Sequence, residues 1–376
     1  MKVVIAVDSL KGSLSSVEAG LAVRKGILRA HPEAETVVKP LADGGEGTTE
    51  ALVQGLGGER VDVTVTGPYG VPVRAYYGLL PETGTAVMEM AQAAGITLSE
   101  ERNPLRASTR GVGEMVRDAL ARGVRDFLIG IGGSATNDGG VGMLSALGYR
   151  FLTAEGESAG EGAEALGKIG RILPPDDEVR EMLAASTLRI ACDVTNPLCG
   201  PSGATYVYGP QKGLMAGQLP QVDADMEHFA AVSAAFLGAD RREAPGTGAA
   251  GGLGFAFRAY LGAELVPGVP LVLDAIGLDR ELADADYLVT GEGRLDGQTV
   301  MGKAPIGAAQ AAKRHGVRVI AFAGSVAEDA GACNEAGIDA FFPIVRGVTT
   351  LAEAMWPANA RTNMSAAAEQ VFRLLG

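Results

Sequence analysis

Hydrophobic and polar positions at the start of the chain follow two periods in turn. Residues 3–7 and 36–40 are short apolar runs, and each is followed by a stretch with apolar residues at helical spacing, at about 15–30 and 47–56. Strand-like runs followed by helical periodicity are typical of strand–helix units in a parallel sheet. The first 60 residues therefore predict two such units.

The same alternation returns after about residue 263. Strands are predicted at 286–290, 318–323 and 340–345, and helices at 305–314, at about 328–336 and in the stretches that lead to Leu375. Because both ends of the chain carry the pattern of a parallel sheet, we expect them to form one α/β domain.

The middle of the chain has a different pattern. From residue 60 to residue 90, three short strand-like runs are separated by the turns Gly-Pro-Tyr-Gly and Pro-Glu-Thr-Gly. Short strands joined by tight turns indicate an antiparallel sheet. From about 100 to 260, helices and strands are mixed. The helices are predicted at 111–121, 218–237 and 251–261, and the strands at 127–131 and 189–191.

Taken together, these patterns predict an α/β protein. A chain of 376 residues has the length of two domains, with three as the upper number. We expect a discontinuous α/β domain from residues 1–60 and 263–376, with a mixed α+β domain inserted at 61–262.

Charge and cysteine usage narrow the classes of function. With 45 acidic and 32 basic residues, the formal net charge is −13. This argues against general nucleic-acid binding, because phosphate backbones require a basic face. The net charge does not exclude a small anionic ligand if local cations or helix N-termini hold it. Three cysteines without metal-site spacing, no signal-peptide core and no spanning apolar run predict a cytoplasmic protein without a membrane partner.

Glycine is unusually frequent, with 54 residues, and much of it lies beside acidic or amide side chains. Five loops have this character: 43–48, 132–140, 192–197, 209–213 and 291–296. At least three follow a strand-like run, which places them where open α/β sheets bind ligands. Glycine N–H groups can approach phosphate oxygens, and carboxylates with amides suit Mg²⁺. Asp and Asn beside Gly are also ordinary turn formers, but plain turns do not require the Glu and Lys of these loops.

Two nucleotide-binding fingerprints are present only in part. Residues 246–251 match G-x-G-x-x-G, but no strand precedes them, which disfavours a dinucleotide site. Residues 297–304 approach a phosphate loop, but Ala304 stands where Ser or Thr would ligate magnesium. Lys303 is then either a point charge for a phosphate or a solvated lysine at a loop end. The absence of a G-x-S-x-G elbow and of a histidine motif disfavours a serine hydrolase and a histidine base.

Seven sequence blocks occur in order over nearly the whole chain. They are Asp8-Ser-Leu-Lys11-Gly-Ser13, Pro40-Leu-Ala-Asp43-Gly-Gly-Glu46-Gly-Thr48, Ile131-Gly-Gly-Ser134-Ala-Thr-Asn137-Asp138-Gly-Gly, Cys192-Asp193-Val-Thr-Asn196-Pro, Tyr208-Gly-Pro-Gln211-Lys212-Gly, Gly248-Ala-Ala-Gly-Gly-Leu-Gly254 and Thr290-Gly-Glu292-Gly-Arg-Leu-Asp296-Gly-Gln298-Thr. This set resembles the type I bacterial glycerate kinases. Leu10 and Tyr208, where that family usually or often has Phe, are packing-type differences.

The resemblance implies a fold and an activity. The fold would be a Rossmann-like three-layer α/β/α domain with the inserted mixed domain, and the active site would lie in the cleft between them. The activity would be phosphorylation of D-glycerate by ATP with Mg²⁺, giving 2-phosphoglycerate and ADP, while a 3-phosphoglycerate product stays open. The partners would be small molecules, and a homodimer is one option for the oligomeric state.

Phosphoryl transfer requires cations on the phosphate oxygens, magnesium, and a carboxylate that accepts the proton of the attacking hydroxyl. We predict Asp193 as the base or a magnesium ligand, since it follows an apolar strand and precedes a proline turn. Lys11, Asp43 and Glu292 are the other predicted catalytic residues, and Asp138 and Asp296 are predicted metal ligands. Substrate and phosphate contacts are predicted for Ser9, Glu46, Gly132, Gly133, Ser134, Asn137, Asn196, Gln211, Lys212 and Lys303.

Two other functions stay open. One is a kinase for another small hydroxy acid that uses the same loops. The other is a non-catalytic module that holds a sugar acid or a phosphate. The number of carboxylates favours a transferase, because a binder of anions gains nothing from several acidic side chains beside its ligand, whereas a magnesium-dependent enzyme does.

Overall fold

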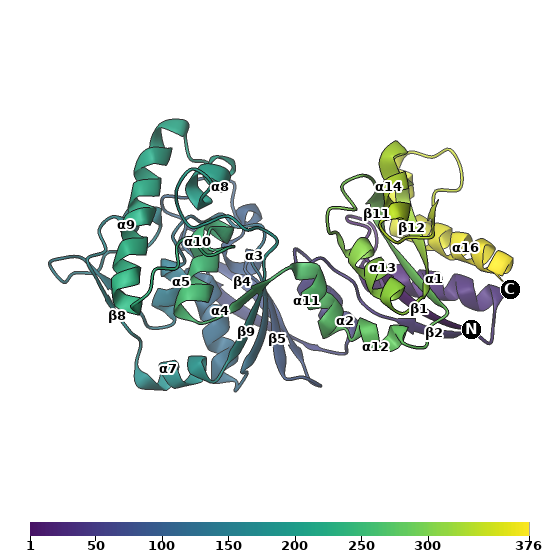
Figure 1. The fold of residues 1–376 in the computed structure, drawn as a ribbon, viewed down its shortest axis with the longest axis horizontal. Helices are drawn as coiled ribbons and strands as arrows, with labels where there is room; N and C mark the ends of the chain where they lie inside the picture. Colours follow the sequence, from purple (N-terminus) through teal and green to yellow (C-terminus); the bar gives the residue numbers. More distant parts are fainter. Residues whose placement is uncertain (376) are drawn as a thin grey trace. The chain divides into compact units, whose positions relative to one another are not determined.

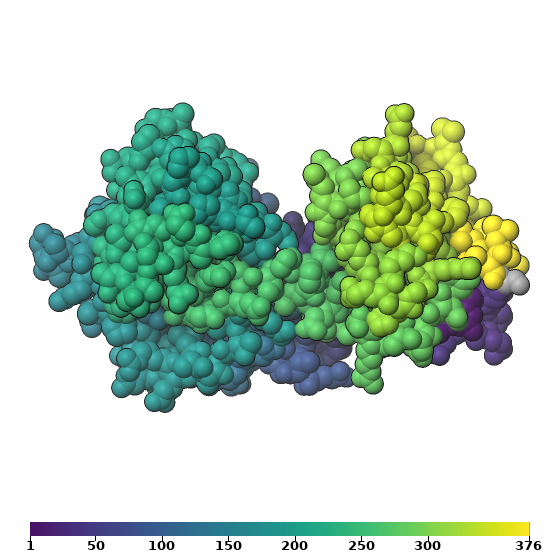
Figure 2. Space-filling model, viewed as in Figure 1, coloured from purple at the N-terminus to yellow at the C-terminus, as the bar shows by residue number. Residues whose placement is uncertain are grey.

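The computed structural model describes residues 1–375, which divide into two compact units. The first unit comprises Met1–Asp43, Glu50–Gly58 and the chain from Val269 onward, and the second comprises Gly44–Thr49 and Glu59–Gly268. Figure 1 shows both chain ends, purple and yellow, within the first unit. The space-filling view shows the surface of the second unit in the colours of the middle of the chain (Figure 2).

The first unit is built on a five-stranded sheet in the order β13-β12-β11-β1-β2. All neighbouring strands are parallel, as the sequence predicts. The strands are β1 (Lys2–Val7), β2 (Glu35–Val38), β11 (Tyr287–Leu295), β12 (Arg318–Val326) and β13 (Ala340–Pro343). Strand order reverses between β1 and β11, because β1 leads outward to β2 whereas β11 leads the other way to β12 and β13. In open α/β sheets, ligands bind outside the carboxyl ends of the strands at such a reversal.

Helices cover this sheet on both faces. On one face, α1 (Ser16–Ala30) and α16 (Pro357–Leu375) lie side by side and bury apolar side chains against β1, β11 and β12. Their approach is close, because a Cβ on Gly26 would lie 2.2 Å from the carbonyl oxygen of Ser365. On the other face, α13 (Ala304–Arg314) contacts β1, β11 and β12. The shorter helical segments are α2 (Thr48–Gly55), α11 (Gly268–Ala275), α12 (Leu278–Leu282), η4 (Glu328–Gly331), α14 (Ala332–Glu335) and α15 (Leu351–Met355).

The second unit contains a six-stranded sheet in the order β10-β9-β6-β5-β4-β3. Its strands are β3 (Glu59–Thr66), β4 (Pro72–Leu80), β5 (Thr85–Glu89), β6 (Asp126–Gly130), β9 (Thr187–Ala191) and β10 (Glu264–Val266). The pairs β3–β4 and β4–β5 are antiparallel, as predicted, and the remaining pairs are parallel. The chain is therefore a mixed α/β protein, as the sequence predicts.

The second unit has a large core formed by this sheet and the helices around it, of which α3 (Ala91–Ala94) and α4 (Arg110–Ala121) contact the sheet. The other helices, which pack on one another and on a small β7–β8 hairpin (Arg150–Leu152, Arg171–Leu173), are α5 (Val141–Ala146), α6 (Ala163–Leu166), α7 (Asp177–Ala184), α8 (Ala204–Lys212), α9 (Leu219–Leu237) and α10 (Ala249–Phe255). Phe229, Phe255 and Tyr260 form an aromatic group with ring centroids 5.8 to 6.5 Å apart.

Three local predictions were wrong. Residues 291–295 are not a loop, because β11 continues to Leu295 in register with β12. Residues 209–212 lie at the end of α8, which Gly213 terminates at a φ of +114°. The helix predicted at 251–261 becomes helical only after residues 250–252, which have positive φ, and it then continues from α10 into the π-helical segment η3 (Ala256–Tyr260). Neighbouring strands and helices decide all three, and their positions are not visible in a local pattern.

No helix within residues 1–375 is long and apolar enough to span a membrane. The three cysteines are free thiols.

Candidate functional site

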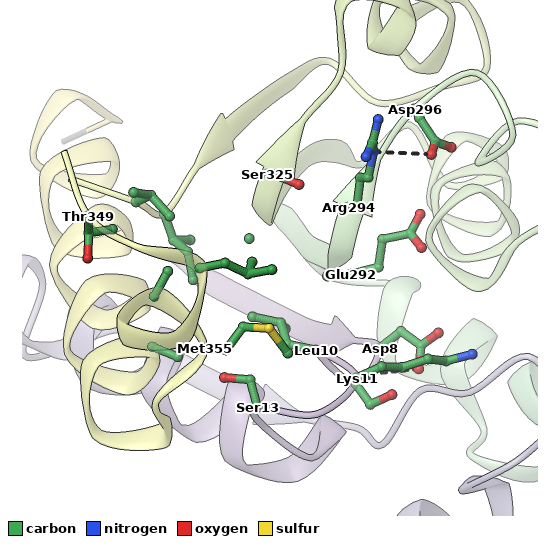
Figure 3. Close-up of a pocket in the computed structure, with 18 of the residues that line it drawn as sticks. Asp8, Leu10, Lys11, Ser13, Glu292, Arg294, Asp296, Ser325, Thr349 and Met355 are labelled. Atoms are coloured by element: carbon green, nitrogen blue, oxygen red, sulfur yellow. Dashed lines mark hydrogen bonds and ion pairs between the residues drawn. The ribbon is translucent and has the colours of Figure 1, made fainter. Parts of the chain in front are cut away.

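A pocket of about 690 Å³ opens in the first unit at the carboxyl ends of β1, β11, β12 and β13. One part of it, here called the polar end, is formed by Asp8, Lys11, Asp43, Glu292, Asp296 and Lys303. The apolar lining residues, here called the apolar arm, are Leu10, Ile344, Val345, Leu351, Ala354 and Met355, and the hydroxyl residues Ser13, Ser325, Thr349 and Thr350 line the pocket with them. Figure 3 shows the labelled acidic residues at one end, with Leu10 and Met355 between them and Thr349.

Asp8 lies at the strand reversal. It follows β1 directly, and its N–H donates to the carbonyl oxygen of Gly291 on β11 at 2.8 Å. Its Oδ1 accepts the N–H of Ser9 at 2.6 Å. Burial raises the pKa of Asp8 to about 7, and the nearby carboxylates of Asp43 and Glu292 add to this rise, while the Ser9 N–H and Lys11 oppose it. Asp8 can therefore exchange a proton near neutral pH.

Gly291 allows β11 to lie close to β12 at the end of β1. A Cβ at this position would lie 1.9 Å from the carbonyl oxygen of Phe322 on β12. No other residue fits there, so the glycine lets β11 approach β12 directly below the pocket. Glu292, the next residue, then lies one position beyond the last pairing between β1 and β11.

Glu292, Asp296 and Lys303 are held together by a turn after β11. The Thr299 hydroxyl donates to Oε1 of Glu292 at 2.8 Å and accepts the N–H of Asp296 at 3.1 Å. Lys303 Nζ lies 3.6 Å from Glu292 Oε2 and 3.7 Å from Asp296 Oδ1. Lys303 is also the N-cap residue of α13, as expected for a lysine at a helix start.

The two carboxylates of this turn differ in acidity. Burial raises the pKa of Glu292, although Thr299 and Lys303 act against the rise. Burial would also raise the pKa of Asp296, but Lys303 and the N–H groups of Gln298 and Thr299 together lower it. The polar end thus combines carboxylates that release protons at different pH values with an adjacent cation.

The loop after β1 places Ser9 and Lys11 at the same pocket. Leu10 and Leu14 form an isolated antiparallel bridge, with the N–H of Leu10 donating to Leu14 at 2.9 Å. Gly12, at a φ of +75°, turns the chain between them. The loop therefore buries Leu10 while Lys11 remains exposed at the polar end.

In the second unit, other predicted residues lie at the carboxyl ends of the parallel strands. Gly132 and Gly133 are exposed after β6, and Asp193 is exposed two residues after β9. Oδ1 of Asp193 accepts the N–H of Gly268, at the start of α11, at 2.9 Å. Ser134 is buried in a bridge to Gly95.

Glu46 is exposed and lies in the segment Gly44–Thr49, which belongs to this unit. The buried Glu89, at the end of β5, accepts the N–H groups of Gly47 at 3.2 Å and Thr49 at 2.8 Å. Burial raises the pKa of Glu89. The nearby Glu46 adds to this rise, whereas the hydrogen bonds from Thr49 and Gly47 oppose it. Glu89 therefore fixes the loop that carries Glu46.

Asp138 and Lys212 lie inside the second unit. Asp138 is fully buried and accepts hydrogen bonds from the N–H and hydroxyl of Thr109 and from the N–H groups of Gly140 and Gly142. Lys212 Nζ donates to the Thr136 carbonyl at 2.7 Å. Burial lowers the pKa of Lys212 to about 7, against the attraction of Asp138. Burial raises the pKa of Asp138, against its hydrogen bonds.

The remaining predicted residues of this unit have partners within it or lie on its surface. Asn137 Nδ2 donates to the Thr205 hydroxyl at 3.0 Å. Asn196 donates to the carbonyl of Ser202 and accepts the hydroxyl of Tyr208 at 2.6 Å. Gln211 is exposed on α8.

The structure thus brings Ser9, Lys11, Asp43, Glu292, Asp296 and Lys303 to one pocket. The sequence prediction of site residues omitted Asp8 and Glu89. Each lies at the end of an apolar run, the same signal that selected Asp193, so both could have been found by applying it at every strand.

The polar end offers several carboxylates to a metal ion. Within residues 1–375, no three His, Cys, Asp or Glu side chains are close enough together to enclose a metal ion. Four carboxylates nevertheless line one pocket, and Mg²⁺ is usually held by one or two carboxylates together with water and substrate phosphates. The donor type at the polar end therefore fits Mg²⁺ that arrives with a phosphate ligand.

Comparison with known proteins gives a consistent result. The model of the glycerate kinase family matches residues 3–376. The chain is 47% identical over 356 residues to a glycerate kinase of Bacillus subtilis (strain 168), covering 94% of this chain and 93% of that protein. It is 44% identical over 356 residues to a glycerate 2-kinase of Escherichia coli (strain K12), with the same coverage. A crystal structure from Salmonella typhimurium LT2, of a protein provisionally named glycerate kinase 2, superposes with a TM-score of 0.91 at 43% identity, covering 100% of this chain and 98% of that one.

Proposed function

The chain belongs to the glycerate kinase family, and we propose that it transfers the γ-phosphoryl group of ATP to D-glycerate in a Mg²⁺-dependent reaction. The products would be ADP and 2-phosphoglycerate. The 2-position is supported by the name of the Escherichia coli relative, a glycerate 2-kinase. The protein is a kinase by its family, and the nucleotide, the metal and the position of the phosphate are the proposed parts.

The observation that carries this proposal is the protonation chemistry of the polar end. A kinase needs a carboxylate that is ionised at working pH yet basic enough to take the proton of the attacking hydroxyl. Asp8, with a pKa of about 7, has this property. The hydroxyl oxygen of D-glycerate would form a bond to the γ-phosphorus, its proton would pass to Asp8, and the bond between the γ-phosphorus and the bridging oxygen would break to release ADP.

Asp193, which the sequence predicts as the base or a magnesium ligand, stays the competing hypothesis for the base. It lies exposed at the carboxyl end of β9, and its Oδ1 accepts the N–H of Gly268. The roles proposed for the other residues of the second unit, including Glu46, Gly132, Asn196 and Lys212, also stay predictions.

Lysines and the metal would balance the charge of the phosphates. Lys11 and Lys303 lie at the polar end and can pair with phosphate oxygens as point charges. We propose Asp296, whose pKa is lowered, as the residue of this pocket that holds Mg²⁺. When bound, Mg²⁺ would neutralise charge that develops on the β- and γ-phosphate oxygens.

The direct test is a coupled assay of ADP release from ATP, MgCl₂ and D-glycerate, followed by phosphorus NMR of the product. We expect turnover that stops in EDTA and a product spectrum of 2-phosphoglycerate. A spectrum of 3-phosphoglycerate would correct the position. Turnover with L-glycerate or glycolate but not D-glycerate would support a kinase for another hydroxy acid. Binding of D-glycerate without turnover would support a non-catalytic module. A cytoplasmic location and a homodimer stay predictions of the sequence.

A further inference from the structure

We propose that the apolar arm of the pocket in the first unit holds the nucleoside of the phosphate donor, with its phosphates directed to the polar end. This inference rests on the proposed function, because it assumes a nucleotide donor. It goes beyond that function by assigning the base and ribose to particular residues on α15 and the segment before it.

The size of the pocket is the first argument. A volume of about 690 Å³ lies in the range that accommodates drug-sized ligands, roughly 300–1,000 Å³. A three-carbon acid such as D-glycerate leaves most of this volume empty. A nucleotide, with a flat base, a ribose and a chain of phosphates, is both long and large enough to occupy both parts of the pocket.

The second argument is the separation of polarity along the pocket. Figure 3 shows Asp8, Lys11, Glu292 and Asp296 toward one end, with Leu10 and Met355 toward Thr349 at the other. Ile344, Val345 and Leu351 also line the pocket, and Leu351 lies on the same short helix, α15, as Met355. A nucleotide has the same polarity, because its base is flat and mostly apolar on its faces while its phosphates are charged. D-glycerate is polar at every carbon and gains nothing from the arm.

The third argument is the solvent exposure of two apolar residues of the arm. Leu351 is 76% exposed and Val345 37% exposed, although both line the pocket. Apolar side chains at a concave surface gain free energy when a ligand removes them from water, at about 25 cal/mol per Å². The arm therefore has apolar area available for a base to bury.

The wall of the arm is already ordered. Thr350 caps α15 through a capping box with Glu353, in which the N–H of Glu353 donates to the Thr350 hydroxyl at 3.3 Å and the N–H of Thr350 donates to Glu353 at 3.1 Å. Asn359 also donates to the carbonyl of Glu353 at 2.8 Å. Because these contacts hold α15, the ligand does not have to order it, and less binding free energy is lost on ordering.

The test places a larger side chain in the apolar arm by a substitution on α15. Ala354 lines the pocket, so Ala354→Phe places an aromatic ring in the arm, whereas Ala352→Phe changes an exposed residue of the same helix that does not line it. Binding of adenosine, of ADP with Mg²⁺ and of inorganic tripolyphosphate is measured by isothermal titration calorimetry, and KM for ATP and for D-glycerate by the coupled assay. Leu351→Glu, at an exposed position, is a second variant in case Ala354→Phe does not fold.

We expect Ala354→Phe and Leu351→Glu to weaken adenosine and ADP about tenfold or more, with tripolyphosphate binding and KM for D-glycerate close to wild type. Ala352→Phe should behave as wild type in every measurement. Equal adenosine affinity in wild type, Ala354→Phe and Leu351→Glu would overturn the inference, as would a rise in KM for D-glycerate alone. An inactive wild type that still binds adenosine through the arm would refute the proposed function while supporting the nucleoside site.

Discussion

Asp8 in the first unit and Asp138 in the second are both carboxylates whose pKa is raised by burial, yet their surroundings differ. Asp138 is fully buried, and its two oxygens accept four hydrogen bonds from Thr109, Gly140 and Gly142. Asp8 lines a pocket and accepts one hydrogen bond, from the Ser9 N–H. Two further carboxylates act on the pKa of Asp8, whereas hydrogen bonds are the main opposing influence at Asp138.

The comparison separates two uses of an acidic residue in a glycine-rich loop. A buried carboxylate whose acceptors are satisfied fixes the backbone around it. A carboxylate at a pocket, crowded by other carboxylates and short of donors, is instead available to a proton or a cation. Asp138 has the first environment and Asp8 has the second, so changes at the two positions should affect different measurements.

The largest expected effect is on the turnover of Asp8→Asn. The amide keeps the shape of the side chain but does not accept a proton, so kcat should fall by about two to four orders of magnitude, the usual scale for loss of a general base. The melting temperature should stay at or above that of the wild type. Asp193→Asn is the matched variant for the competing hypothesis. If Asp193→Asn loses turnover on this scale while Asp8→Asn keeps it, the assignment of the base to Asp8 is wrong.

Asp138→Ala should instead lower stability. Its removal leaves buried N–H and hydroxyl donors without an acceptor, and we expect the free energy of unfolding to fall by about 3–5 kcal/mol. Urea denaturation followed by circular dichroism measures this change. Asp62→Ala is the control, because Asp62 is an exposed residue of β3 in an ion pair with Arg60 and should change stability by less than about 1 kcal/mol. Equal losses of stability in the two variants would show that Asp138 stabilises the fold no more than an exposed carboxylate does.

The pH dependence of stability should show the raised pKa of Asp8. The pKa of Asp8 is about 7 in the folded protein, against an ordinary value of 3.8. Between pH 3.8 and pH 7, the folded state therefore keeps a proton that the unfolded chain has released. The free energy of unfolding of the wild type, relative to Asp8→Asn, should therefore decrease as pH rises toward 7, by up to about 1.4 kcal/mol per pH unit.

The difference in the free energy of unfolding between the wild type and Asp8→Asn should become constant above pH 7, where the folded and unfolded states have both lost the proton. Urea denaturation of both proteins in EDTA, at several values between pH 5 and pH 8, measures it. A difference that increases with pH would have the wrong sign for a raised pKa.

The smallest expected effect is that of Lys303→Met. Loss of this cation at the polar end should raise KM for ATP about tenfold, close to 1.4 kcal/mol, because a phosphate loses one point charge. Lys25→Met, at an exposed lysine of α1 outside this pocket, is the control and should leave KM unchanged. A KM for ATP equal in the two variants would make Lys303 a structural partner of Glu292 and Asp296 only.

Much of the fold could be read from local patterns. The apolar run at 3–7 and the helical periodicity at 15–30 became β1 and α1, and the turn-separated runs from 60 to 90 became the antiparallel strands β3 to β5. Such elements are predictable because burial of one face imposes its period on the sequence. Residues 291–295 and 209–212 were not predictable in this way, since a glycine-rich stretch has no clear period and takes the conformation that its neighbours impose.

The sequence by itself determined the α/β class, the family and the residue types that phosphoryl transfer requires. Only the tertiary structure decided which of those residues share an environment. Asp8 and Glu292 are 284 positions apart and meet because β1 and β11 are adjacent parallel strands, whereas Asp138 and Lys212 are withdrawn into a core. The physical reason is that a side chain's intrinsic acidity belongs to the residue, but its desolvation and its neighbouring charges come from segments that folding brings to it.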